Sequence, residues 1–160
     1  MSFFKGFKYA FCGIIRCIKN ERNMRTHTVA ALYVLIFARF FNFSRGEFAL
    51  LLLTIGAVMA AEAVNTSIEE LCNKVCTRRD ERIKRSKDAA AGAVLILAIF
   101  AALIGVTLFS DPTGWKAAFD FFTGSVWHLA GLILLTVLSL AFIIFVPRKT
   151  RVNKDEKEGK

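Results

Sequence analysis

The sequence predicts an all-α integral membrane protein, with an interfacial amphipathic helix at its N-terminus followed by four transmembrane helices. Of the 160 residues, 55% are hydrophobic, and they form long uninterrupted runs that a soluble core of this size does not contain. Residues 89–109 and 126–146 contain no Asp, Glu, Lys or Arg. Each run has the roughly 20 residues that a helix needs to cross a hydrocarbon core of about 30 Å. These two runs are the clearest predicted spans.

Two earlier segments complete the four predicted spans. Residues 28–43 are short for a span and contain Arg39, whereas residues 48–61 are apolar and lead directly into Glu62. The connection between these segments is short, so the two helices are expected to be antiparallel neighbours. The longer connection at residues 110–125 contains several helix breakers, and we expect an outer loop there.

The basic residues indicate which side of the membrane each connection faces. The net charge is +9, and six Lys or Arg residues precede the first predicted span, seven lie between spans two and three, and six follow span four. The other two connections carry only Arg45 and Lys116. By the positive-inside rule, both termini and the middle connection are cytoplasmic. The positive charge therefore indicates contact with a membrane surface rather than with nucleic acid.

The N-terminal segment has the pattern of a helix that lies in the membrane interface. Apolar residues recur at helical spacing between residues 3 and 19, and four cations occupy the rest of the helix. Such a helix rests its apolar face at the acyl boundary and its cations on anionic headgroups. No small-residue cleavage site follows the first apolar segment, so this N-terminus is expected to be retained.

The four cysteines, Cys12, Cys17, Cys72 and Cys76, all fall on the predicted cytoplasmic side, where thiols normally remain reduced. Cys72 and Cys76 are one helical turn apart and could share a metal. No nearby histidine or further cysteine pair completes a zinc pattern. The simpler interpretation is that they are small, partly buried side chains.

The second predicted span carries a polar stripe. On a helix, Glu62, Asn65, Thr66 and Glu69 are related by i, i+3, i+4 and i+7, so their side chains share one face. Glu62 lies about 20 Å along the helix, where a lone carboxylate costs about 2.5 kcal/mol or more. An ionisable residue at that depth usually faces a bundle interior and has a function. The alternative is a protonated, hydrogen-bonded structural glutamate.

The two carboxylates of the stripe lie at different depths, because Glu69 is about 10 Å nearer the cytoplasm than Glu62. The deeper group can meet the headgroup of a lipid, and the shallower one can hold a cation that bridges to a phosphate donor. Mg²⁺ prefers oxygen ligands and takes one or two carboxylates plus phosphate oxygens. Glu21, at the cytoplasmic edge of the first span, is a candidate for the second carboxylate.

Lys87 and Asp88 open the third predicted span. A lysine at a helix start is unfavourable for the helix dipole, so a bound anion such as a phosphate would offset its charge. The alternative is a cation that anchors the helix at the membrane boundary. No G-x-x-x-x-G-K-[ST] pattern occurs in the sequence, so any nucleotide is bound without a P-loop.

Three segments together resemble the small prokaryotic diacylglycerol kinase and undecaprenol kinase family: N-E-R-N-M-R-T-H from Asn20, A-E-A-V-N-T-S-I-E from Ala61, and K-D-A-A-A-G-A-V from Lys87. The resemblance implies a kinase of the bacterial plasma membrane that transfers the γ-phosphate of ATP to a lipid alcohol as a homotrimer. It implies that Glu62 is the general base and that Glu21 and Glu69 hold Mg²⁺ with ATP.

The same resemblance implies further contacts with ATP. The residues that it assigns to ATP binding are Tyr9, Glu21, Glu69, Lys87 and Asp88, with Asn65 as a supporting amide. The family often has a Glu- and His-containing segment before the Lys-Asp pair, whereas this chain has T-R-R-D-E at residues 77–81.

The resemblance covers about the first 110 residues, and most family members end after three spans. The chain therefore divides into a lipid kinase domain at 1–110, an outer loop with an extra span at 111–147, and a basic cytoplasmic tail at 148–160. The segments R-N-M-R-T-H and A-G-A-V resemble those of family members from Gram-positive-type bacteria, which implies undecaprenol rather than diacylglycerol as the substrate. The alternative function is an ion or proton pathway along the Glu62 stripe, but the third and fourth spans offer few polar residues to continue it.

Overall fold

The computed structural model describes residues 3–75 and 80–145, and these residues form six α-helices and no strand. In chain order the helices are α1 (Phe3–Asn20), α2 (Arg22–Ala38), α3 (Arg45–Val75), α4 (Glu81–Leu108), α5 (Pro112–Thr123) and α6 (Val126–Phe145). The all-α fold is therefore confirmed.

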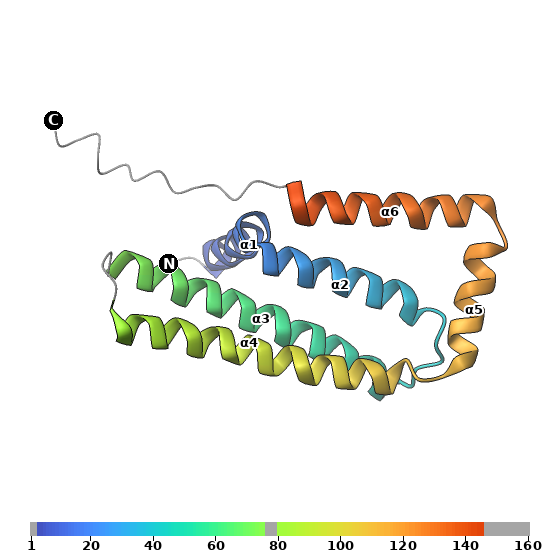
Figure 1. Cartoon of the computed structure of the whole chain (residues 1–160), viewed down its shortest axis with the longest axis horizontal. Coiled ribbons are helices and arrows are strands. Elements are labelled where there is room, and N and C mark those ends of the chain that lie inside the picture. Colours follow the sequence, from blue (N-terminus) through green and yellow to red (C-terminus); the bar gives the residue numbers. More distant parts are fainter. Residues whose placement is uncertain (1–2, 76–79, 146–160) are drawn as a thin grey trace.

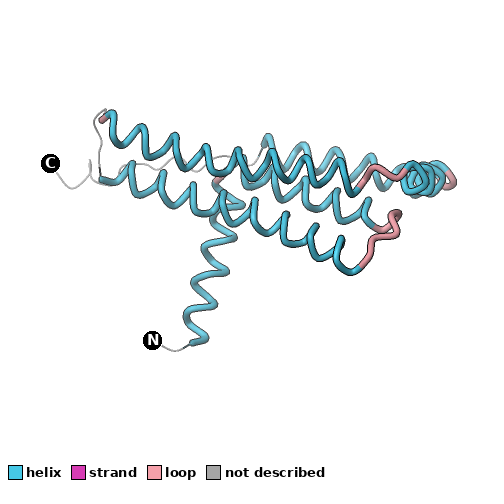
Figure 2. Tube along the Cα trace, turned by 90° about the horizontal axis from the view of Figure 1, so that it is seen from below, coloured by secondary structure: helices cyan, strands magenta, loops and turns pink. Residues whose placement is uncertain are grey.

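Four of the helices run side by side along the long axis of the molecule. Figure 1 shows that α2, α3, α4 and α6 alternate in direction, and that α6 returns along α2. Helix α1 contacts α2 and α3 and projects from the bundle at a steep angle (Figure 2). A helix that crosses the bundle direction in this way suits the membrane plane when the bundle spans the membrane.

Three helices, α3, α4 and α6, are long and apolar enough to cross a membrane. The first predicted span, residues 28–43, corresponds to α2, which begins and ends earlier than predicted and has 17 residues. Its first turns are polar, because they contain Arg22, Asn23 and Arg25. That α2 also crosses the membrane stays a prediction. The tail at 148–160 lies outside the described residues.

The prediction of an outer loop at residues 110–125 was wrong, because most of this segment is helix α5. Its breakers act as helix ends: the Asp111 side chain accepts a hydrogen bond from the Thr113 backbone N–H at 2.9 Å, Pro112 occupies the first turn, and Gly124 follows the last. Helix α5 lies across the end of the bundle (Figure 1). It therefore closes the end opposite the α3–α4 connection.

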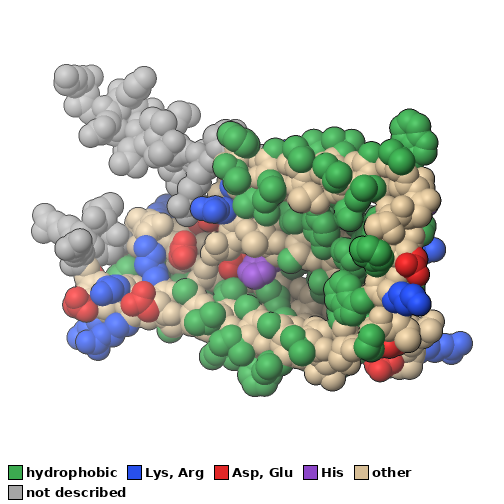
Figure 3. Space-filling model, turned by 45° about the vertical axis from the view of Figure 1, so that its right-hand side comes forward, with side chains coloured by type: hydrophobic (Ala, Val, Ile, Leu, Met, Phe, Trp, Pro, Cys, Tyr) green, Lys and Arg blue, Asp and Glu red, His purple; other side chains and the backbone are tan. Residues whose placement is uncertain are grey.

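Aromatic rings attach α5 to the bundle. Ring centroids of Trp115 lie 5.7 Å from Phe37 and 5.5 Å from Phe41, and Phe41 meets Phe109 edge-on at 4.8 Å. Hydrophobic side chains are spread over much of the face seen in Figure 3, and most of the charged side chains gather toward its two ends. This distribution is that of a protein whose central belt contacts lipid.

Candidate functional site

The polar stripe lies on one continuous helix, α3, and faces the interior of the bundle. Glu62 is 2% exposed, and Asn65 and Thr66 are each 6% exposed, whereas Glu69 is half-buried. Helix α3 begins well before the stripe, where Ser44 and Glu47 form reciprocal hydrogen bonds of 2.7 and 3.2 Å between side chain and backbone. The predicted helical register, which places these polar residues on one face, is thus the observed one.

The stripe opens into a polar cavity of about 630 Å³ between α2, α3 and α6. Glu21 and Arg25 approach it from the start of α2, and Glu62 and Glu69 from α3. Ile143 and Ile144, in the last turn of α6, form its apolar side. The cavity therefore brings together carboxylates, a guanidinium and a hydrocarbon surface.

Three buried polar atoms of these cavity residues have no hydrogen-bond partner within the described residues: Arg25 Nε, Glu62 Oε2 and Asn65 Oδ1. The Asn65 side-chain amide donates to Glu69 Oε1 at 3.5 Å, and the Asn23 side chain forms a hydrogen bond with Glu62. Buried donors and acceptors are normally satisfied, and leaving one unpaired costs about 1–3 kcal/mol. Three such atoms around one cavity indicate that it receives a polar ligand.

Arg25 is a part of the site that the sequence does not identify, because its charge is explained equally well as one of the cytoplasmic cations. It is 3% exposed, and its guanidinium donates to the backbone carbonyls of Lys19 at 2.9 Å and Ile143 at 3.5 Å. These carbonyls belong to the last turns of α1 and α6, where a cation is favoured. Its position one helical turn after Glu21 is the signal that could have identified it.

Four predicted site residues, Glu21, Glu62, Asn65 and Glu69, line the same cavity. Lys87 does not line it; its ammonium donates to Asn73 Oδ1 at 2.7 Å, one helical turn beyond Glu69.

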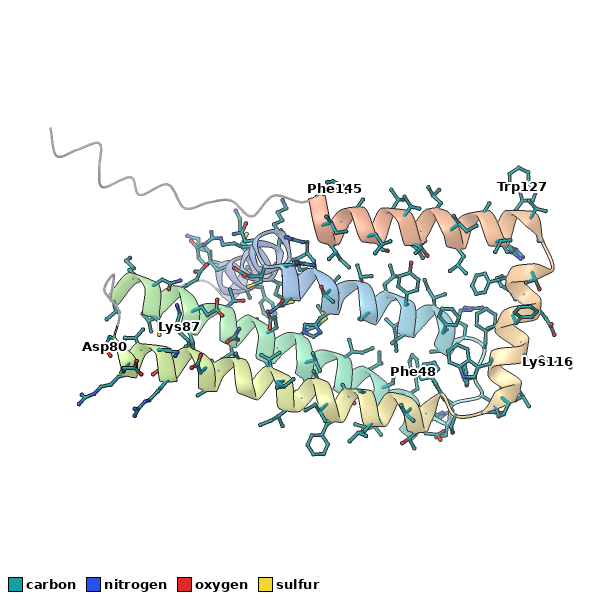
Figure 4. All side chains as sticks on the ribbon, in the orientation of Figure 1. Phe48, Asp80, Lys87, Lys116, Trp127 and Phe145 are labelled. Atoms are coloured by element: carbon teal, nitrogen blue, oxygen red, sulfur yellow. The ribbon has the colours of Figure 1, made fainter. Side chains whose placement is uncertain are left out.

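The other two predicted contacts also lie apart from the cavity lining. Asp88 is exposed on α4, and Tyr9 is 60% exposed on α1. Figure 4 shows Lys87 close to the Asp80 end of α4, away from α5. Lys87 and Asp88 on α4 are thus on the predicted cytoplasmic side of the stripe. Residues 77–79, where the chain departs from the usual family segment, lie outside the described residues.

The carboxylates of the cavity suit a cation that is shared with a ligand. Within residues 3–75 and 80–145, no group of three or more His, Cys, Asp or Glu side chains is placed to hold a metal. Glu21 and Glu69 supply two carboxylates to one cavity, and Mg²⁺ commonly takes only one or two, with phosphate oxygens as further ligands. The donor set fits Mg²⁺. Cys72 is a buried free thiol, and Cys76 lies outside the described residues.

Comparison with known proteins identifies relatives of this chain. It is 36% identical over 107 residues to the undecaprenol kinase of Bacillus subtilis (strain 168), and the matched region covers 67% of this chain and 87% of that protein. It is also 36% identical over 107 residues to a diacylglycerol kinase of Synechocystis, covering 66% and 61% of the two chains. A diacylglycerol kinase of Haemophilus influenzae is 29% identical over 89 residues, which cover 56% of this chain and 75% of that protein.

No solved structure matches the chain. The family model described as prokaryotic diacylglycerol kinase matches residues 8–109, which include α2, α3 and α4 and every predicted site residue. Helices α5 and α6 follow the matched region. The chain therefore belongs to the prokaryotic diacylglycerol kinase family and is a membrane lipid kinase.

Proposed function

We propose that this protein transfers the γ-phosphate of ATP to the hydroxyl of undecaprenol, with Mg²⁺ bound at Glu21 and Glu69. The observation that carries the proposal is the buried Glu62 carboxylate, whose Oε2 lacks a partner in a cavity that also contains these two acidic side chains. The choice of undecaprenol rests on the undecaprenol kinase of Bacillus subtilis, which is matched over 87% of its length, against 61% for the Synechocystis diacylglycerol kinase at the same 36% identity.

In this reaction Glu62 Oε2 accepts the proton of the lipid hydroxyl as its oxygen attacks the γ-phosphorus. The new bond joins that oxygen to phosphorus, and the bond to the β-phosphate oxygen breaks to release ADP. General-base catalysis of this kind contributes about 10²–10⁴-fold to a rate. Asn65 donates to Glu69, which orients one ligand of the cation.

Phosphoryl transfer depends mainly on positioning and on positive charge near the phosphates. Mg²⁺, when bound, supplies charge at the transferring phosphate. Lys87, held by Asn73 one turn beyond Glu69, would neutralise phosphates nearer the water. Tyr9 and Asp88 complete the proposed ATP contacts. With these roles, the nucleotide would lie toward the α3–α4 connection and the lipid hydroxyl toward Glu62.

The test uses the purified full chain with radiolabelled ATP and Mg²⁺, offered undecaprenol or diacylglycerol. We expect phosphorylation of both lipids with a preference for undecaprenol, and a loss of about 10²-fold or more in Glu62→Gln. Glu81→Gln, at the exposed start of α4, is the matched control and should keep wild-type turnover. Failure to phosphorylate either lipid would refute the kinase proposal.

Two variants separate the base from the cation ligand. Glu69→Gln should raise the Mg²⁺ concentration needed for half-maximal rate. Glu70, the next residue on α3, does not line the cavity, so Glu70→Gln should leave that concentration unchanged. Full turnover in Glu62→Gln would show that another group is the base.

The ion-pathway alternative is not favoured by the surroundings of the stripe. From Glu62 toward α5, the next cavity, of about 170 Å³ between α2, α3 and α4, is lined mainly by apolar side chains such as Val34, Leu51, Ile55 and Val58. A continuous path for ions needs polar groups or water along its length. The mainly apolar lining of this second cavity offers few groups that could continue an ion path.

The family resemblance also supports the proposal that the protein acts as a homotrimer, and the distribution of the basic residues supports the proposal that both termini are cytoplasmic. In a single chain many large apolar side chains of α4 are exposed, including Leu95, Ile99 and Leu103, and would contact lipid or a neighbouring subunit. Mass measurement of the purified protein tests the trimer. Thiol labelling of a cysteine added at the C-terminus, reached only from outside the cell, would refute the topology.

A further inference from the structure

Helix α6 follows the region that matches the family model, and yet it reaches the proposed reaction cavity. We propose that the last turn of α6 is the lipid-side wall of this cavity, and that Ile143 and Ile144 restrict which lipid alcohol can bind. The inference rests on the proposed kinase function. It is carried by two observations, the position of both isoleucines in the cavity lining and the attachment of α6 to α2 beside them.

Two hydrogen bonds hold α6 against α2. The Arg25 guanidinium donates to the Ile143 carbonyl at 3.5 Å, and the Tyr33 hydroxyl donates to Thr136 Oγ1 at 3.0 Å, about two turns earlier on α6. Arg25 is itself buried and lines the cavity, so the residue that holds the end of α6 also forms part of the polar side of the cavity. Figure 4 shows Phe145, at the end of α6, above the start of α2.

The chemistry of the wall selects its ligand. The other residues that line the cavity with Ile143 and Ile144 are polar and belong to α3 and the start of α2, among them Asn23, Arg25 and Glu62. A lipid alcohol joins a hydroxyl to a hydrocarbon chain, so its hydroxyl can meet Glu62 while its first carbons contact the isoleucines. The phosphates and ribose of a nucleotide would lose hydration against these methyl groups without gaining hydrogen bonds.

The isoleucines also give the selectivity a direction. A polyprenol continues from its hydroxyl carbon as a single chain with only methyl branches, whereas the carbon next to the hydroxyl carbon of diacylglycerol carries an ester-linked acyl chain. An isoleucine wall beside the base therefore admits the narrower alcohol more readily. Removing side-chain volume should improve kcat/KM for diacylglycerol more than for undecaprenol, and adding volume should lower kcat/KM for diacylglycerol more than for undecaprenol.

The kinetic test compares Ile144→Ala and Ile144→Trp with the same changes at Ile133, another α6 isoleucine of similar exposure (60% and 56%) that does not line the cavity. We expect Ile144→Trp to raise KM for the lipid alcohol about tenfold or more, with KM for ATP unchanged. Ile144→Ala should shift the kcat/KM ratio toward diacylglycerol, and both Ile133 variants should match wild type. Equal changes for both lipids, or a change in KM for ATP alone, would overturn the inference.

A second measurement does not depend on turnover. A long-chain alcohol with a photoactivatable group on the carbons next to its hydroxyl is irradiated with the full chain in vesicles, and the labelled peptide is identified by mass spectrometry. Label on the last turn of α6 that unlabelled undecaprenol competes away, and that Ile144→Trp reduces, supports the wall. Label elsewhere overturns it, even if the kinase is active; label on α6 without phosphorylation of any lipid refutes the kinase proposal instead.

Discussion

The ammonium of Lys87 on α4 lies 2.7 Å from the side-chain oxygen of Asn73 on α3. Asn73 follows Glu62 and Glu69 by eleven and four residues on the same helix face, so this contact extends the polar stripe by one turn. It holds a cation between the cavity and the α3–α4 connection, where the proposed nucleotide would approach from the water.

Replacement of Lys87 by methionine should raise KM for ATP about tenfold, because one charge-assisted contact with phosphate is lost. KM for the lipid should not change. Lys84→Met, an exposed lysine one turn earlier on α4, is the control and should behave as wild type. Initial rates over a range of ATP concentrations measure the effect, and equal losses in both variants would show that only general surface charge matters.

Arg25→Lys should destabilise the junction of α1, α2 and α6. Lysine carries one nitrogen where the guanidinium offers a fork, so it cannot reach both the Lys19 and Ile143 carbonyls in the same geometry. A lost buried hydrogen bond costs about 1–3 kcal/mol. Thermal unfolding in detergent measures the change, with Arg16→Lys on the exposed part of α1 as control. An unchanged melting temperature would show that the two carbonyl contacts contribute little.

The pKa of the Cys17 thiol is raised by its partial burial and then by the nearby carboxylates of Glu70, Glu21 and Glu62. Because the thiolate is the reactive form, maleimide should label Cys17 slowly at neutral pH, and its rate should keep rising above the ordinary pKa of a thiol. Exposed Cys12 serves as the reference in single-cysteine variants. Glu70→Gln should speed the labelling of Cys17, and a rate unaffected by this change would argue against the charge effect.

Gly114→Ala should loosen the attachment of α5. A Cβ at this position would lie 2.5 Å from the Phe41 ring, which is itself packed between Phe109 and Trp115. Overpacking of this kind costs about 1–3 kcal/mol. Gly131→Ala on α6, where a Cβ meets nothing within 4 Å, should not lower the melting temperature. The Gly114 variant should keep its KM for ATP, because α5 lies at the end of the bundle away from Lys87 (Figure 4).

The main parts of the fold are predictable from the sequence because their signals are local. The charge-free runs identify α4 and α6, and helical periodicity alone places Glu62, Asn65 and Glu69 on one face of α3. Helix α5 is not predicted because Asp111, Pro112 and Gly124 are typical breakers, although the same residue types also begin and end helices. Local sequence does not distinguish the two uses.

The parts of the site that the sequence does not predict depend on contacts between distant residues. Arg25 and Ile143 are separated by 118 positions, and nothing in either segment indicates that α6 returns along α2. The same holds for Lys87, which is expected to act near the stripe but whose partner Asn73 is set by the packing of α4 on α3. The roles of Tyr9 and Asp88 stay predictions.

The cavity has acidic and amide groups on α2 and α3 and a hydrocarbon wall on α6, with Lys87 beyond it on the side of the α3–α4 connection. In the proposed reaction, the two substrates therefore arrive from different phases, ATP dissolved in water and the lipid alcohol by lateral diffusion in the membrane, a two-dimensional solvent. The reaction rate should therefore follow the mole fraction of the lipid alcohol at the surface rather than its total concentration. Added inert detergent would slow the enzyme by surface dilution even when the amounts of protein, ATP and lipid remain constant.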